Sequence, residues 1–257
     1  SPEVWRSQTS SLYITGKGAA MGKNYAGGRE KEAYIRGLFS DIAPVYEFIN
    51  HLLSFNLDRF WRRRAVARFW RPSHRRVLDA CCGTGELTEI LRQRLPAGGS
   101  VIGVDFCEAM LAIAKKRHRN LQNVAYQVGN IQQLSFPDNS FDAVYNCFAL
   151  RNVSDVAGAL AEMRRVLKPG GQLVIIDLTL PRSALWHWYL SHVVPFIGRL
   201  CHGDRKPYTY LSASIRQFYP PAELRERLLQ AGLQQVEYLQ FCGGVVTAVC
   251  GTVAETD

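Results

Sequence analysis

The chain has 257 residues, of which 47% are hydrophobic and 21% charged, and this balance excludes a disordered or fibrous protein. A chain of this length can bury a large core as one α/β domain. Its formal net charge is +9, and eight arginines lie between Arg59 and Arg76 in a stretch without acidic residues. Positive charge this local predicts contact with an anionic surface, such as lipid headgroups or nucleic acid phosphates. A solvated helix face is the alternative.

The cysteines indicate a compartment. None of the seven forms a C-x-x-C pair and several lie inside apolar runs, which predicts buried, reduced thiols in a cytoplasmic protein. The spacings of His and Cys contain no zinc signature, so no metal site is expected. No apolar stretch reaches the roughly 18 residues that a membrane-spanning helix needs.

The first part of the chain divides into two regions. Residues 1–30 contain five glycines and little periodic apolar content, which predicts a flexible segment. From residue 31 to 70 the apolar positions recur at helical spacing. Pro44 and the Ser-Phe-Asn run at 54–56 interrupt this pattern, so we expect two or three N-terminal helices.

From residue 76 onward, the spacing of apolar residues alternates between the pattern of a strand and the pattern of a helix. This alternation predicts an α/β fold with a doubly wound, mostly parallel sheet, Rossmann-like in type. A Lys-Pro-Gly-Gly turn at 168–171 precedes the fifth strand, and an antiparallel C-terminal hairpin closes the chain. We expect a single domain over 31–257 with a helical insertion at about 180–218. The expected strands are 76–82, 101–105, 124–128, 141–146, 171–177, 236–241 and 245–249, and the helices are 86–94, 108–118, 156–167 and 221–231.

The turn after the first strand predicts a cofactor site. Gly83 and Gly85 let the backbone approach a ligand, and Asp105 ends the next strand, where an acid can accept hydrogen bonds from a ribose. Thr88 replaces the third glycine of a dinucleotide fingerprint, and Asp79 would repel a pyrophosphate. An acid there suits an ammonium group instead, so the pattern favours S-adenosyl-L-methionine and methyl transfer. A glycine turn without any ligand is the alternative.

Several longer runs are more specific than this turn. These runs are 43–50 with 53–55, 134–142, 149–153, 166–171 and 208–216. In these runs the chain resembles the ubiquinone/menaquinone biosynthesis C-methyltransferase family, particularly its demethylmenaquinone methyltransferase branch, and the resemblance extends from about Leu38 to Gly251. The resemblance implies a class I S-adenosylmethionine-dependent methyltransferase that methylates a ring carbon of a polyprenylated quinol.

The resemblance also implies the cofactor contacts. Asp105 is expected at the ribose hydroxyls, Asn130 at the adenine edge, and Asn146 with Cys147 at the methionyl end. The chain departs from the family pattern at Glu86, where relatives commonly carry Asp, and at Cys147, where some carry Ser. The positions that match cofactor contacts are Thr84, Asp105, Asn130, Ile131, Asn146 and Cys147.

The family pattern places Tyr46, Arg151 and Asn152 near the chemistry. Arg151 would stabilise a phenolate or act through a bound water, because a guanidinium is too basic to serve alone as the base. The alternative is that Arg151 and Asn152 cap the following helix. The aromatic segment 185–200 would form a lid over the ring and a channel for the tail, and a buried aromatic helix is its alternative. We expect His187, His192 and His202 to be packing or surface groups.

The sequence is compatible with further functions. An RNA methyltransferase would use the same turn, but residues 146–149 read Asn-Cys-Phe-Ala and lack an Asn-Pro-Pro-Tyr signature, so no nucleic acid partner is expected. The acceptor could instead be a small aromatic or natural-product molecule, or the chain could be a catalytically silent cofactor-binding partner of another enzyme. We expect a cytoplasmic enzyme in peripheral contact with anionic membrane. A homodimer is compatible with the sequence, which does not predict the oligomeric state.

Overall fold

The computed structural model describes residues 28–181, 183–197 and 206–255. Most of the segment predicted to be flexible lies outside these residues, as do Cys201 and His202. Residues 28–30 begin the first helix, so the boundary predicted at residue 31 was too late. Their side chains are exposed, which is why the apolar spacing alone did not reveal them.

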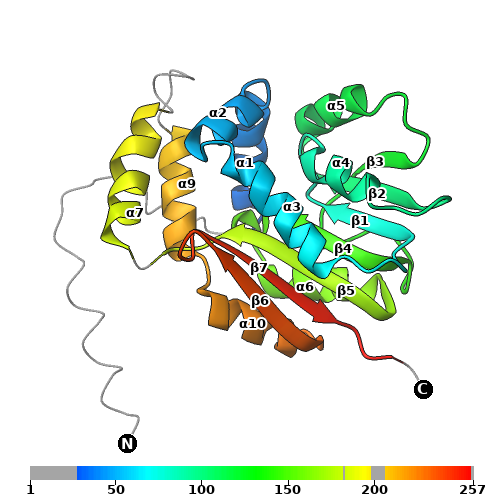
Figure 1. The fold of residues 1–257 in the computed structure, drawn as a ribbon. Coiled ribbons are helices and arrows are strands. Elements are labelled where there is room, and N and C mark those ends of the chain that lie inside the picture. The colour runs from blue at the N-terminus through cyan, green and yellow to red at the C-terminus, as the bar shows by residue number, and fades with distance from the viewer. Residues whose placement is uncertain (1–27, 182, 198–205, 256–257) are drawn as a thin grey trace, which may run out of the picture.

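The described residues form one seven-stranded sheet with the order β3-β2-β1-β4-β5-β7-β6 (Figure 1). β1 to β5 are parallel, and β7 pairs antiparallel with both β5 and β6. This arrangement confirms the doubly wound sheet and the closing hairpin. The strands are Arg76–Ala80 (β1), Ser100–Asp105 (β2), Val124–Val128 (β3), Phe141–Cys147 (β4), Leu167–Leu178 (β5), Gln234–Phe241 (β6) and Val246–Thr252 (β7).

The helices confirm the predicted N-terminal division and the alternation that follows it. Breaks fall around Pro44 and at residues 54–56, as the sequence indicates. The helical segments are Gly28–Ile42 (α1), Tyr46–Leu53 (α2), Leu57–Phe69 (α3), Glu86–Arg92 (α4), Glu108–Arg117 (α5), Leu150–Asn152 (η1, a 3-10 turn), Val156–Arg165 (α6), Ala184–Trp188 (α7), Tyr189–Val193 (η2, a π-helical turn), Lys206–Gln217 (α9) and Pro221–Gln230 (α10).

Helices cover both faces of the sheet. On one face, α6 and α10 pack with residues such as Leu160 and Leu228 against the strands. On the other face, Trp61 of α3 and Leu91 of α4 do the same. The central strands are apolar on both faces, since the run from Leu173 to Ile176 in β5 has no exposed surface. Burial on both faces explains why their sequence reads as continuous rather than alternating.

Two predictions about local structure were wrong. The predicted turn at 168–171 is part of β5, which begins at Leu167 and pairs there with Phe141 before the register shifts. Gly170 lies in this irregular part of β5 with a φ of 73°. The Lys-Pro-Gly-Gly run, which is typical of a turn, therefore marks a bulge inside the strand. Cys242 is exposed in the β6–β7 turn, contrary to the expectation of buried thiols, because this turn projects beyond the sheet.

Several of the other helices gather at one side of the sheet. Figure 1 shows α1, α2, α7 and α9 grouped there, beside the carboxyl end of β5. In doubly wound sheets ligands bind outside the carboxyl ends of the strands, so these helices stand where they can cover a ligand. Within the described part of the chain, no helix is both long and apolar enough to span a membrane.

Candidate active site

The turn after β1 adopts left-handed backbone at three positions. Cys81, Gly83 and Gly85 have φ values of 62°, 54° and 85°. A Cβ on Gly85 would lie 2.5 Å from the Tyr126 hydroxyl, so that position requires glycine for space as well as for conformation. The Gly83 N–H donates to Asp105 Oδ2 at 2.8 Å, which ties the turn to the end of β2.

The first cavity lies at the ends of β1, β2 and β4 and is closed on one side by α1. Five of the residues predicted to hold a cofactor line it: Gly83, Asp105, Asn130, Ile131 and Cys147. Further lining residues are Glu32, Ile35, Phe39, Tyr46, Cys81, Phe106, Met110, Gly129, Gln132, Phe148, Ala149, Asn152, Val153 and Ser154. Four other predicted cofactor residues, Asp79, Thr84, Gly85 and Asn146, are not among the lining residues.

Asp105 keeps acceptor capacity toward the first cavity. Its two oxygens receive one backbone N–H each, from Gly83 and from Cys107, both at 2.8 Å. An ionised carboxylate has about four lone-pair sites, so positions remain for two ligand hydroxyls. This arrangement suits the ribose role that the sequence predicts.

Asp79, Thr84 and Asn146 support the turn from within. Asp79 Oδ2 accepts a hydrogen bond from the Thr88 hydroxyl at 2.6 Å, and burial raises the pKa of Asp79 to about 7. The Thr84 carbonyl accepts from Arg117, and Asn146 Nδ2 donates to the Ala80 carbonyl. The structure therefore brings Asp79 close to the cavity without exposing it there.

Glu32 of α1 is a site residue that sequence reasoning missed. Its Oε1 accepts hydrogen bonds from Gln132 Nε2 at 2.6 Å and from the Ser154 hydroxyl at 2.9 Å, and it faces the first cavity. These bonds tie α1 to the loops after β3 and β4. No sequence signal singled it out, because it is one of several charged residues on an amphipathic helix.

The second cavity is mostly apolar. It lies among α2, α3, α7, η2 and α9, so the predicted aromatic segment does line it. Its polar lining groups are few, and Arg62 and Arg151 are the cationic ones among the described residues. The apolar and aromatic lining residues are Tyr46, Leu53, Phe55, Leu57, Trp61, Phe148, Leu178, Pro181, Trp186, Tyr189, Leu190, Val194, Leu211, Ile215 and Val245.

The two cavities meet at Tyr46 and Phe148, which line both. Asn152 lines the first and Arg151 the second, so the structure brings the three predicted catalytic residues to the junction. Phe148 follows β4 with a φ of 57°, a left-handed backbone conformation that costs energy for a bulky side chain. Burial raises the pKa of the Cys147 thiol to about 12, so this neighbour of the junction stays protonated.

Arg151 is held by a carboxylate that the sequence analysis did not identify. Its Nη1 lies 2.6 Å from Asp177 Oδ1 and donates also to the Phe148 carbonyl, and its backbone N–H donates to Asp177 Oδ2. Burial by itself would lower the pKa of Arg151, but Asp177 raises it above its usual value. The sequence offered one signal for this carboxylate, because Asp177 is an acid at the end of the apolar run of β5.

The capping alternative for Arg151 and Asn152 is wrong. The N-cap of α6 is Asp155, whose side chain accepts a hydrogen bond from the Gly158 N–H at 2.9 Å. The Asn152 side chain instead accepts one from the Tyr210 hydroxyl at 3.1 Å. The described histidines of the aromatic segment, His187 and His192, bond to backbone carbonyls of nearby residues, as expected for packing groups.

A glycine turn after β1, an acid at the end of β2 and a cavity at the carboxyl ends of the strands are typical of doubly wound folds that bind a nucleotide-like ligand. Residues 28–253 match the ubiE/COQ5 methyltransferase family, and the chain belongs to this family. The predicted family, enzyme class and cofactor, S-adenosyl-L-methionine, are therefore confirmed.

Two curated relatives cover most of the chain. The demethylmenaquinone methyltransferase of Lactiplantibacillus plantarum is 41% identical over 85% of this chain and 95% of its own. The ubiquinone/menaquinone biosynthesis C-methyltransferase UbiE of Francisella philomiragia is 35% identical over 86% and 92%. An S-adenosylmethionine-dependent methyltransferase of Aquifex aeolicus has a similar fold, with a TM-score of 0.59 at 21% identity over 81% of this chain and 98% of that one.

Proposed function

We propose that this enzyme transfers a methyl group from S-adenosylmethionine to a ring carbon of a polyprenylated quinol, of the demethylmenaquinol type. The observation that carries the proposal is the apolar second cavity, which meets the first cavity at Tyr46 and Phe148. A prenylated ring needs such a cavity, whereas RNA or a small polar acceptor does not. The names of the two curated relatives support the same substrate class.

The first cavity would hold the cofactor along the ends of three strands. Asp105 accepts hydrogen bonds from the ribose, Asn130 and Ile131 flank the adenine, and Cys147 lies toward the methionine sulfur. Asp79 acts at longer range on the ammonium group. Bound S-adenosylmethionine supplies an electrophilic methyl carbon, which the ring carbon of the quinol attacks in line.

Arg151 and its neighbours would act on the acceptor. Asp177 fixes the guanidinium and offsets its charge, so Arg151 works through directed N–H groups that stabilise the quinolate oxygen as charge develops. Tyr46 and Asn152 hold the ring, or a water that accepts the ring proton, between the two cavities.

An acceptor series tests the proposal. Isotope-labelled S-adenosylmethionine is offered with demethylmenaquinol, with a benzoquinol that has the same tail, with a tail-free naphthoquinol and with RNA, and the product masses are measured. We expect a methylated prenylated quinol and much weaker turnover without the tail. Equal turnover of the tail-free compound, or labelling of RNA alone, would contradict the proposal. The variant Asp105→Ala serves as the cofactor-deficient control.

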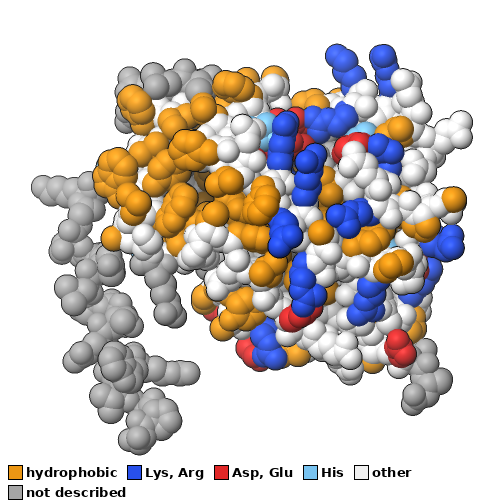
Figure 2. Space-filling model, viewed as in Figure 1, with side chains coloured by type: hydrophobic (Ala, Val, Ile, Leu, Met, Phe, Trp, Pro, Cys, Tyr) orange, Lys and Arg blue, Asp and Glu red, His pale blue; other side chains and the backbone are white. Residues whose placement is uncertain are grey.

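We infer in addition that the mouth of the second cavity contacts an anionic membrane. Phe55 lines that cavity and is 70% exposed, so the apolar wall continues onto the surface. Figure 2 shows hydrophobic side chains gathered on the side where α7 lies, with Lys and Arg beside them. Exposed apolar residues on or next to the helices that line this cavity are Phe48, Leu52, Phe55, Leu57, Phe60, Leu185, Trp188 and Phe196.

The arginine stretch contributes to this surface only in part. Arg59, Arg63 and Arg64 are exposed on α3, next to the apolar residues. Arg62 is buried in ion pairs, and Arg68 pairs with Glu237. A membrane-binding role therefore rests on the exposed arginines, each worth about 1 kcal/mol near an anionic surface.

A further inference from the structure

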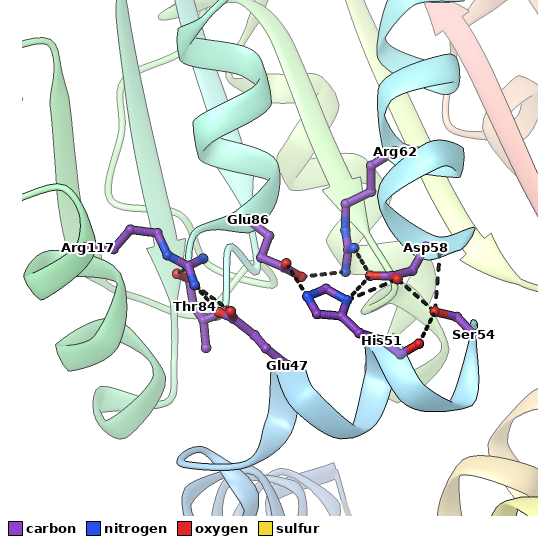
Figure 3. A network of polar contacts seen from close by, with 8 residues as sticks. All are labelled: Glu47, His51, Ser54, Asp58, Arg62, Thr84, Glu86 and Arg117. Carbon is purple, nitrogen blue, oxygen red and sulfur yellow. Dashed lines mark hydrogen bonds and ion pairs between the residues drawn. The ribbon is translucent and has the colours of Figure 1, made fainter. Parts of the chain in front are cut away.

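Arg62 belongs to a closed ring of polar contacts formed by Arg62, Asp58, His51 and Glu86, which Figure 3 shows and which we call the ion-pair ring after its Arg62–carboxylate pairs. Its guanidinium pairs with Asp58 through Nη1 and, at 3.2 Å, with Glu86 through Nη2. His51 faces the same two carboxylates, with Nδ1 3.0 Å from Asp58 and Nε2 3.0 Å from Glu86. Each carboxylate thus contacts both Arg62 and His51, and Asp58 also accepts a hydrogen bond from the Ser54 hydroxyl at 2.7 Å.

The ion-pair ring joins the two halves of the active site. His51 lies on α2 and Asp58 and Arg62 on α3, the helices that line the second cavity. Glu86 is the first residue of α4, directly after the glycine turn of the first cavity. Glu86 stands where the resembling family commonly carries Asp, and its longer side chain reaches both His51 and Arg62. The ion-pair ring therefore sets the distance between acceptor helices and cofactor turn.

Arg62 also touches the junction of the cavities. Its guanidinium carbon lies 4.9 Å from the centre of the Phe148 ring, a distance at which a cation is attracted to an aromatic face. Arg62 is buried, so this attraction is not screened by bulk water. Phe148 lines both cavities in a left-handed conformation, and Arg62 lies against its ring there.

The carboxylates around the ion-pair ring have cationic side chains beside them. Glu47, His51 and Glu86 are close enough together to suggest a cation site. Arg117 already pairs with Glu47, and Arg62 with Glu86, so these carboxylates have cationic partners within the described residues. The ion-pair ring is a connection between helices, and no ion is needed to explain it.

We propose that Arg62 is a positioning residue for methyl transfer. Held by Asp58, Glu86 and His51, it fixes the Phe148 ring at the wall shared by the two cavities, so that the methyl group and the ring carbon meet at the right distance. A displacement of about 1 Å at a reacting centre can cost about 100-fold in rate. Loss of the ion-pair ring should therefore reduce kcat and leave cofactor affinity almost unchanged.

The first test uses Arg62→Lys, which keeps the charge but cannot bridge both carboxylates and stack on Phe148 with a planar group. We expect kcat to fall about 100-fold, with the Kd for S-adenosylmethionine by calorimetry and the Tm close to wild type. Arg68→Lys, exposed on the same helix and paired with Glu237 at the surface, is the matched control. Wild-type kcat in Arg62→Lys, or parallel losses of kcat, affinity and Tm, would overturn the proposal.

A second test asks whether Arg62 acts through Phe148. Phe148→Leu removes the aromatic face, and the double variant should be scarcely slower than the slower single variant, because both changes break one contact. Additive losses of kcat would overturn the link. A second pair, Glu86→Asp and Glu86→Gln, separates side-chain length from charge, and both should lower kcat.

The inference rests on the proposed quinol substrate only for the choice of acceptor. If the wild type methylates no quinol, the proposed function is wrong. The positioning role of Arg62 can still be tested by a measurement that needs no acceptor. A fluorine label on the ring of Phe148 should give one narrow resonance in the wild type and a shifted or broadened one in Arg62→Lys. An unchanged resonance would contradict the positioning role.

Discussion

Arg151 and Asp177 form a buried ion pair, with Nη1 and Oδ1 2.6 Å apart, that joins the turn after β4 to the end of β5. Asp177 has no exposed surface. The pair anchors the guanidinium beside Tyr46 and Asn152 at the junction of the two cavities. Its geometry makes the position of Arg151 depend on a residue 26 positions further along the chain.

Replacing Asp177 by Asn should destabilise the protein strongly, since it leaves the Arg151 charge buried and uncompensated. Breaking a buried pair in this way costs about 3–5 kcal/mol in the free energy of unfolding. Urea denaturation measures this loss. Asp138→Asn is the control, because Asp138 pairs with Arg165 at the exposed surface and such pairs contribute about 0–1 kcal/mol. Equal effects of the two variants would show that burial of the Asp177 pair is unimportant.

Arg151→Lys should keep cofactor affinity and lose most turnover. Lys retains the charge but lacks the planar fork that contacts Asp177 and the Phe148 carbonyl together. Loss of one donor aimed at developing charge lowers turnover by about 100- to 1000-fold. Calorimetry, melting temperature and turnover are measured on the same preparation. Wild-type turnover, or unfolding with turnover per folded molecule intact, would mean that Arg151 has no catalytic role.

Asp105→Ala should weaken the binding of S-adenosylmethionine by about 1–3 kcal/mol, because it removes the acceptors proposed for the ribose and frees the Gly83 N–H. Asp105→Asn keeps one acceptor oxygen and should lose less. Titration calorimetry gives both affinities, with Asp41→Ala, exposed on α1, as the control. Unchanged affinity in Asp105→Ala would exclude the ribose contact.

Asp79 should make stability fall as pH rises. Burial raises its pKa from 3.8 to about 7, so between these values the unfolded chain releases this proton while the folded chain retains it. The unfolded state then binds fewer protons, and the free energy of unfolding declines until about pH 7 and stays lower above it. Asp79→Asn, which retains an acceptor for Thr88, should remove this decline and raise the Tm at pH 8 but not at pH 4. Identical pH dependence in the two proteins would contradict the raised pKa.

Sedimentation with vesicles tests the membrane surface. Wild type should bind anionic vesicles better than neutral ones, and added salt should weaken the binding. The triple change Arg59→Glu, Arg63→Glu and Arg64→Glu should reduce binding more than 100-fold, at about 1 kcal/mol for each lost cation. Lys116→Glu on α5, on the other side of the molecule from α7 in Figure 1, is the control. Equal binding to neutral and anionic vesicles would show that the exposed arginines form a solvated helix face and do not bind the membrane.

Local pattern alone determined the elements of this protein and their order. Periodicity identified the strands and helices because a buried face must recur every two residues in a strand and every three or four in a helix. The glycine turn was predictable for the same kind of reason, since left-handed backbone at Gly83 and Gly85 excludes most other residues. The runs around Tyr46 and Arg151 indicated the family and placed both residues in the site.

Tertiary structure decided which polar groups face the ligand and which support it. Asp79 and Asp105 both end strands and look equivalent in sequence, yet Thr88 encloses one while the other lines the first cavity. Glu32 and Asp177 belong to the site because each contacts a loop that is distant in the chain. The ion-pair ring around Arg62 likewise joins three helices through side chains that no local pattern connects. Such contacts depend on how distant elements pack, because burial and partner choice are properties of the assembled core and not of any short stretch of chain.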